Sequence, residues 1–357
     1  KGHFGVDVYS RDGSSGIMTV SNTYGNFGRG NHRNIIIDRA AQRLYRYDQG
    51  HFGSIHEMIT GSLNESGSNR NDDVVSYNHL TAIPSEWNAI GGDNMEFSLT
   101  PLVIAENKYI LMGSSYNGPY IIRRYSGTGA HGKQKLSWVP QKHFQPTNHE
   151  LQWMGMPWYK DGYVYQTAGR GGISRWYLGD DGTLENAQTQ FDPYGGNTNT
   201  TKGGNTQGYY YGGFTDGRFI YAHWYNSTTT SGISIFDTDF TGSLELVGEI
   251  NTKTSIPNNG TSDWHTGLSA VPDPNRERGM LFVPIYDSDS TASGSVEVYK
   301  VHHTGQPELI DRKVVENLTG NVSDAGEPLI GGIAVDTSGR YLYQFWLTSM
   351  MNLINFY

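Results

Sequence analysis

A strand–turn–strand pattern that recurs along the chain constrains its fold more than any other feature of the sequence. The clearest copies begin at Gly172 (GISRWYLGDDGTLENAQTQF), Gly232 (GISIFDTDFTGSLELVGEI) and Gly294 (GSVEVYKVHHTGQPELIDRKV). Each has an apolar run alternating with polar residues, then a polar turn containing glycine, then a second run. This is the pattern of a β-hairpin. Looser copies begin at Gly5, Gly53 and Gly118.

A second pair of predicted strands precedes most of these hairpins. MGMPWYKDGYVYQTAG precedes the copy at Gly172 and turns at Asp161-Gly162; YYYGGFTDGRFIYAHWYN precedes the copy at Gly232 and turns at Asp216-Gly217. The predicted unit is therefore four antiparallel strands, at intervals of 48 to 65 residues between the hairpin glycines. Five complete units fit between about residues 31 and 315, with two strands before them and three after.

Repeated four-stranded units of this length are typical of β-propeller blades. The repeat resembles those of lactonase-like and related seven-bladed propellers, over most of the chain. Its residues follow the order glycine, β-branched residue, aromatic residue, aspartate, glycine and leucine. The resemblance implies an all-β fold in which residues 1–357 form a single β-propeller domain with four-stranded antiparallel blades. Six blades result if an N-terminal strand completes the last blade. Seven or eight result if the chain is a fragment of a larger secreted protein.

Composition excludes several classes of function. The net charge is −9 and no basic run is longer than Arg123-Arg124, which argues against nucleic acid as a partner. No apolar stretch approaches 18 residues, so no membrane span is predicted, and the absence of Cys excludes disulfides and thiolate catalysis. The low charged fraction of 17%, with abundant Gly and polar residues, predicts an extracellular or cell-surface location, with the periplasm as the alternative.

The glycine-rich segment AGRGG (168–172) has two interpretations. A phosphate-binding loop opens a helix, whose N-terminus supplies N–H donors, but the residues after Gly172 read as a strand. The segment therefore reads as a loop between the second and third strands of a unit, with Arg170 as a candidate ligand contact.

The candidate site lies in the loops that lead into the first strand of each unit and in those between its second and third strands, because both sets share one face of a propeller. Histidines occupy comparable places in three incoming loops, where imidazoles can move protons or bind ligands. The catalytic candidates are His32, His149, His265 and Tyr209, and the ligand-binding candidates are Arg33, Glu96, Glu150, Arg170, Trp224, Asp263 and Trp264. Histidines at such turns also tie blade to blade by bonding backbone groups, and this structural alternative stays open.

Alternating aspartates at Asp287 and Asp289 resemble the start of a calcium loop, since hard cations take several oxygen ligands. The full loop pattern is not completed, and turn formation through aspartate side chains explains the residues equally. Ca²⁺ or another divalent cation is the one cofactor that the sequence suggests.

Three functions fit these features. The first is a binding module or adhesin that grips a polysaccharide or glycan, because aromatic rings stack on sugars and polar loops bind hydroxyl groups. The second is a carbohydrate-active enzyme, either a polysaccharide lyase using His or Tyr with Arg, or a glycoside hydrolase with two carboxylates. The third is a receptor for a small ligand or metal chelate. The lack of a recognisable catalytic motif favours the binding module.

Overall fold

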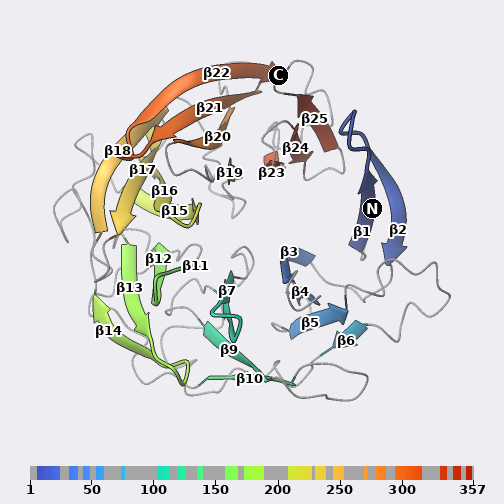
Figure 1. Ribbon diagram of the computed structural model, residues 1–357, viewed down its shortest axis with the longest axis vertical. Helices are drawn as coiled ribbons and strands as arrows, with labels where there is room; N and C mark the ends of the chain where they lie inside the picture. The colour runs from blue at the N-terminus through green and yellow to red at the C-terminus, as the bar shows by residue number, and fades with distance from the viewer. Residues whose placement is uncertain are drawn as a thin grey trace. The chain divides into compact units, whose positions relative to one another are not determined.

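The computed structural model describes the backbone of residues 6–24, 32–38, 43–48, 54–59, 74–76, 103–112, 120–125, 135–139, 157–167, 173–188, 208–226, 230–238, 244–252, 269–271, 278–286, 294–315, 330–335, 341–346 and 351–355. These segments are β-strands and the turns that join them, without a helix (Figure 1). Within them, accordingly, no helix is long and apolar enough to cross a membrane. The predicted all-β class is confirmed.

The chain folds as two compact units, residues 1–145 with 176–187, and residues 146–175 with 188–357. Three sheets belong to the first unit. They are β1 (Val6–Arg11) with β2 (Met18–Tyr24); β3 (His32–Asp38), β4 (Arg43–Asp48), β5 (Ser54–Ile59) and β6 (Val74–Ser76); and β7 (Val103–Ala105), β8 (Tyr109–Met112), β9 (Tyr120–Tyr125) and β10 (Lys135–Trp138).

The next sheet contains β11 (Pro157–Lys160), β12 (Tyr163–Thr167), β13 (Ile173–Leu178) and β14 (Leu184–Gln188), and the division between the units falls within β13. The remaining sheets belong to the second unit. They are β15 (Gly208–Thr215), β16 (Phe219–Asn226), β17 (Thr230–Thr238) and β18 (Leu244–Thr252); β19 (Ser269–Val271), β20 (Arg278–Tyr286), β21 (Gly294–His302) and β22 (Pro307–Val315); and β23 (Ile330–Val335), β24 (Tyr341–Trp346) and β25 (Met351–Asn355).

The predicted repeat is confirmed sheet by sheet. The described strands form five four-stranded sheets in sequence order, preceded by a two-stranded sheet and followed by a three-stranded one. The predicted turn at Asp161-Gly162 joins β11 to β12, with Lys160 opposite Tyr163. Both turn residues have positive φ, 51° and 86°, as a type I′ hairpin turn requires. That a single domain covers residues 1–357 stays a prediction.

The register gives each sheet two distinct ends. In the sheet β15–β18, Thr215 pairs with Ile220 beside the first turn, and Thr238 pairs with Leu244 beside the last hairpin. We call this the turn end. At the opposite end Asn226 pairs with Gly208 and with Thr230. We call this the loop end, because the chain enters the first strand there and passes there from the second strand to the third.

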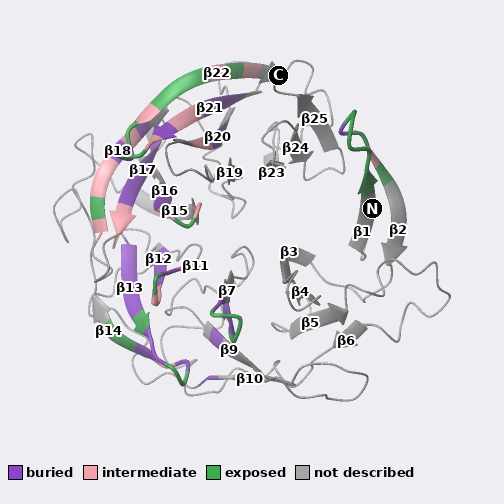
Figure 2. Ribbon diagram, viewed as in Figure 1, coloured by how far each residue is buried: buried purple, intermediate pink, exposed green. Residues whose placement is uncertain are grey.

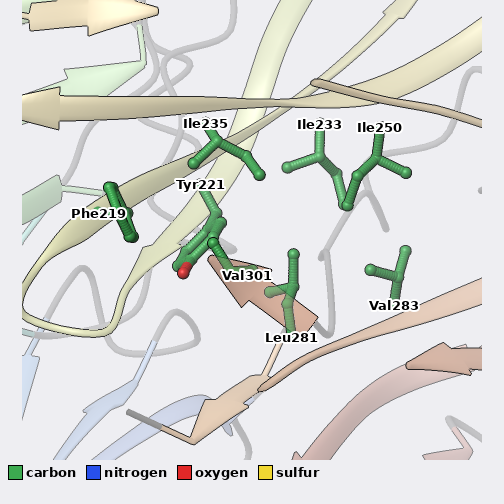
Figure 3. Close-up of a cluster of buried hydrophobic side chains, with 8 residues drawn as sticks. All are labelled: Phe219, Tyr221, Ile233, Ile235, Ile250, Leu281, Val283 and Val301. Atoms are coloured by element: carbon green, nitrogen blue, oxygen red, sulfur yellow. The ribbon is translucent and has the colours of Figure 1, made fainter. Parts of the chain in front are cut away.

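The core of the second unit lies between consecutive sheets. Phe219 and Tyr221 of β16 face a buried cluster that continues into the next sheet (Figure 3). Their neighbours Ile220 and Ala222 point the other way, into a second cluster with Trp158 of β11. Alternate residues of β16 therefore pack into two different cores, because the sheet is covered on both faces. Figure 2 shows the central strand β17 as largely buried for the same reason.

From the sheet β15–β18 onward, like strands lie beside like strands. β15 lies beside β19, β19 beside β23, and the fourth strand β18 beside the fourth strand β22 (Figure 1). Consecutive sheets thus stack with the same strand order, which is what a series of propeller blades requires.

Candidate functional site

Four of the predicted site residues lie on described strands, and all four are at loop ends. His32 is the first residue of β3, opposite Asp48, and Arg33 follows it. On the sheet β15–β18, Tyr209 pairs with Tyr225, and Trp224 lies on β16 at the same end. The backbone therefore places His32 and Arg33 at the loop end of their sheet in the first unit, and Tyr209 and Trp224 at the loop end of theirs in the second. Their side chains are outside the described part of the structure.

The other predicted residues lie outside the described residues, and their roles stay predictions. They are Glu96, His149, Glu150, Arg170, Asp263, Trp264, His265, Asp287 and Asp289. Two of these residues come shortly before described strands in the sequence: His265 precedes β19 by a few residues, and Arg170 precedes β13.

Two neighbouring sheets of the second unit have their loop ends on the same side. The hairpin tip between β21 and β22 contacts Phe219 and Val247, of which Phe219 is the first residue of β16 at its turn end. Since the turn ends meet, the loop ends of β15 and β19 also lie together. The chain thus enters both first strands from one edge, which is the arrangement on which the predicted site depends.

Two tryptophans outside the predicted ligand set, Trp158 and Trp176, belong to the core. Trp158 is 3% exposed and Trp176 is 1% exposed. Both pack inside the protein, so neither can stack on a sugar ring.

Arg175, five residues after the candidate Arg170, is also buried. Its guanidinium lies 5.2 Å from the centre of the Tyr163 ring, and the residue is 6% exposed. Arg175 therefore stacks inside the protein, where it cannot meet a ligand from solvent.

Tyr221 has a raised pKa and belongs to the scaffold. Tyr221 donates from its hydroxyl to Asp216 Oδ2 at 2.7 Å, and burial followed by the Asp216 charge raises the pKa of Tyr221. The other carboxylate oxygen, Oδ1, accepts the backbone N–H groups of Arg218 and Phe219, each at 2.8 Å. Asp216 thus closes the turn between β15 and β16 and leaves no oxygen directed at a ligand.

A buried ion pair was missed by the sequence reasoning. Glu297 on β21 is 3% exposed; Tyr299 donates to its Oε2 at 2.5 Å, and Arg312 donates to its Oε1 from Nε at 2.9 Å. Burial and the neighbouring carboxylate raise the pKa of the Tyr299 hydroxyl. The signal was present in the hairpin copy, because Glu297 and Arg312 are opposite one another in the β21–β22 register.

Within the described ranges, no three His, Asp or Glu side chains are grouped as metal ligands would be. Asp237, which resembles Asp287 in its alternating aspartate pattern, accepts the Thr238 N–H at 2.8 Å. The bond is a local turn contact. The predicted divalent-cation site at Asp287 and Asp289 itself stays a prediction.

Comparison with known proteins gives a likeness of structure. Neither a protein-family model nor a curated protein sequence matches the chain. The periplasmic gluconolactonase of Pseudomonas aeruginosa is 12% identical and similar over 87% of this chain and 77% of its own, with a TM-score of 0.53. A Bacteroides fragilis protein provisionally named a 6-phosphogluconolactonase is 16% identical over 88% and 78%, with a TM-score of 0.53. A Bacteroides uniformis protein of the same provisional name is 15% identical over 88% and 79%, with a TM-score of 0.53.

At these identities the likeness shows the fold, and the fold is a β-propeller of four-stranded antiparallel blades. The prediction of a glycan-binding adhesin is wrong, because these structural neighbours carry the names of sugar lactonases. The error has a physical origin. Aromatic and polar loops suit any ligand with a sugar ring, whether the protein holds it or hydrolyses it.

Proposed function

We propose that the chain is an enzyme that hydrolyses a sugar lactone. The observation that carries the proposal is the likeness to three structures with lactonase names over 87–88% of the chain. Fold alone does not determine activity, so the proposal also needs groups able to perform the chemistry. The loop-end candidates supply them.

Hydrolysis of a lactone requires few groups. A base takes a proton from water, the water oxygen attacks the carbonyl carbon, and the ring C–O bond breaks as its oxygen receives a proton. A cation or N–H donor stabilises the negative oxygen of the tetrahedral intermediate. We assign the base to His149 or His265 and the stabilising charge to Arg170, all in the second unit. Trp224 and Trp264 are assigned to contact with the sugar ring.

The likeness to a periplasmic enzyme supports a location outside the cytoplasm, in keeping with the predicted composition-based location. The chain's charge of −9 disfavours anionic ligands at long range. We therefore place the unphosphorylated aldonolactone ahead of the phosphorylated one as substrate.

The test is release of acid from glucono-δ-lactone and from its 6-phosphate, followed with a pH indicator in weak buffer and corrected for spontaneous hydrolysis. The expected result is protein-dependent hydrolysis that saturates with lactone. A parallel sample treated with EDTA and then resupplied with Ca²⁺ tests the predicted cation. Equal rates with and without protein for both lactones would overturn the proposal.

Variants His149→Ala and His265→Ala separate the two roles left open for these histidines. If a histidine is the base, its variant loses activity and keeps its unfolding temperature. Loss of stability instead identifies a residue that ties blade to blade. Lys313→Ala is the matched control, because Lys313 lies on the outer strand β22 and pairs with Asp311 at the surface.

A further inference from the structure

The hairpin tip between β21 and β22 is a tight turn built around a left-handed glycine. The N–H of His302 donates to the Gln306 carbonyl at 3.0 Å, and the N–H of Gly305 donates to the His302 carbonyl at 2.8 Å. Gly305 has φ +84°, and it is buried although the residues beside it are exposed. A neighbouring element must therefore cover the glycine.

That element is the preceding sheet, β15–β18. Arg218 donates from Nη2 to the His303 carbonyl, and Gln306 donates from Nε2 to the Val247 carbonyl. A Cβ atom on Gly305 would overlap the Val247 side chain and lie 3.4 Å from the Phe219 ring. The tip fits against the preceding sheet only because residue 305 has no side chain.

A β-bulge in β18 lies at the place where the tip contacts the preceding sheet. Ile235 pairs with Gly248 and Phe236 with Leu246, which leaves Val247 as the extra residue of β18. An extra residue has no partner across the ladder, so its carbonyl is available to a group from outside the sheet. A Cβ atom on Gly248 would overlap the Gly305 carbonyl oxygen. Glycines on both sides of the contact allow the two backbones to meet.

The same contact occurs in the first unit, at the tip between β13 and β14. The N–H of Gly182 donates to the Gly179 carbonyl at 2.8 Å, and Gly182 has φ +88°. Tyr109 donates from its hydroxyl to the Asp180 carbonyl at 2.5 Å. A Cβ atom on Gly182 would lie 2.6 Å from Tyr109 Cε1 and 3.1 Å from Val139 Cγ2.

The two contacts correspond position by position. Tyr109 and Phe219 are each the first residue of the second strand of the preceding sheet, β8 and β16. Val247 lies on the fourth strand β18, and Val139 directly follows the fourth strand β10. Residues 176–187, which include the β13–β14 tip, belong to the first unit together with Tyr109.

A third junction shows a related bond. Thr238 is the last residue of β17, beside the tip of the β17–β18 hairpin, and it accepts a hydrogen bond from Lys160 at the end of β11. Lys160 is 8% exposed, so the bond forms away from solvent. The hairpin of β17 and β18 therefore also bonds to the sheet before it.

We propose that the glycine-bearing tip between the third and fourth strands is a clip that fastens each sheet to the preceding one, with its glycine against the aromatic residue that begins the second strand there. The clips join sheets at their turn ends. Relative movement of neighbouring sheets is thereby restrained on the side away from the candidate site.

The alternative explanation is that Gly182 and Gly305 are needed only for their left-handed backbone. Gly217 provides the matched control, because it has φ +88° and no atom within 4 Å of an added Cβ. The substitution Gly217→Ala therefore introduces the backbone strain without the steric overlap.

The experiment compares thermal unfolding of the full chain with Gly182→Ala, Gly305→Ala and Gly217→Ala. The clip predicts that the first two lower the Tm by about 3 °C or more beyond the effect of Gly217→Ala, because overpacking adds to the strain. Equal shifts for all three variants would mean that the glycines serve backbone conformation alone, and the clip would be rejected.

Tyr109→Phe keeps the ring and removes one hydrogen bond, so it tests the clip even if an alanine variant does not fold. The amide of Gly182 should exchange with deuterium about fivefold faster, since loss of one hydrogen bond favours local opening. The Gly305 amide is the internal control and should keep its rate. An unchanged Gly182 rate would contradict the clip.

Discussion

The residues at the turn end and at the loop end of a sheet have different roles. At the turn end, side chains close tight turns or reach the next sheet, as Asp216 and Tyr109 do. Candidate catalytic residues lie at the loop end, among them His32 and Tyr209 on described strands. Under the proposed function, activity therefore depends on the loop end of the repeat and stability on the turn end. Substitutions at one end should therefore leave the property of the other end unchanged.

The largest expected effect is on activity, at the histidine that acts as the base. Whichever of His149→Ala and His265→Ala removes that base should lower kcat/KM for the lactone about 100-fold or more, because a positioned base contributes a factor of this size. Its free energy of unfolding should stay within about 0.5 kcal/mol of the parent value. Kinetics with glucono-δ-lactone and urea unfolding of the same preparation measure both quantities. A variant that loses stability in proportion to activity would break the comparison.

The next effect is on stability at the turn end. Gly305→Ala should lower the free energy of unfolding by about 2 kcal/mol more than Gly217→Ala, because the added methyl group overlaps Val247. The kcat of the folded fraction should equal that of the parent. Activity measured well below the unfolding temperature is the check. A lowered kcat would show that the clip also positions the loop end.

A smaller effect is expected between the two ends, at the ion pair of the buried Glu297 on β21 with Arg312 on β22. Glu297→Gln removes the charge that Arg312 faces, and it retains an oxygen for the Tyr299 hydroxyl. Because Arg312 is 56% exposed and can return to water, the loss should be only about 1 kcal/mol. Urea unfolding of the variant measures the loss. An increase in stability would show that the cost of burying Glu297 exceeds the gain from pairing.

The smallest effect is expected at the exposed hairpin of β1 and β2. Bonds from the Ser14 hydroxyl, and then from the backbone and hydroxyl of Ser15, hold the pKa of Asp12 well below its usual range. A depressed carboxyl pKa adds stability above the unfolded pKa near 3.9 and loses it as pH falls through the folded value. NMR titration of Asp12 should find it ionised at pH 3, with the turn intact. An ordinary titration near pH 4 would contradict the bond network.

Much of the scaffold could be predicted from the sequence, because hairpin chemistry is local. Asp161-Gly162 and Asp216-Gly217 predicted turns that the structure contains, since Asp-Gly pairs suit positive φ. The clip could not be predicted, because Gly182 looks like any turn glycine until Tyr109 is placed against it. The burial of Arg175 could not be predicted for a similar reason: a strand covered on both faces has no outward side.

The candidate site was less predictable than the scaffold. The loop-end position of Tyr209 followed from strand order, and the register agrees with it. The choice between holding and hydrolysing a sugar-like ligand does not follow from residue types, because His, Arg and Trp serve both. The proposal of a lactonase instead of an adhesin rests on the likeness in fold and not on the sequence pattern.

Lactone hydrolysis and thermal unfolding, measured on the same samples of the parent chain, His149→Ala, His265→Ala and Gly305→Ala, separate activity from stability. We expect the parent chain to accelerate hydrolysis, one of the two histidine variants to lose the rate and keep the Tm, and Gly305→Ala to lower the Tm and keep the rate. A parent chain without activity, or histidine and glycine variants that each lose rate and Tm together, would show that stability and activity are not separated in this way.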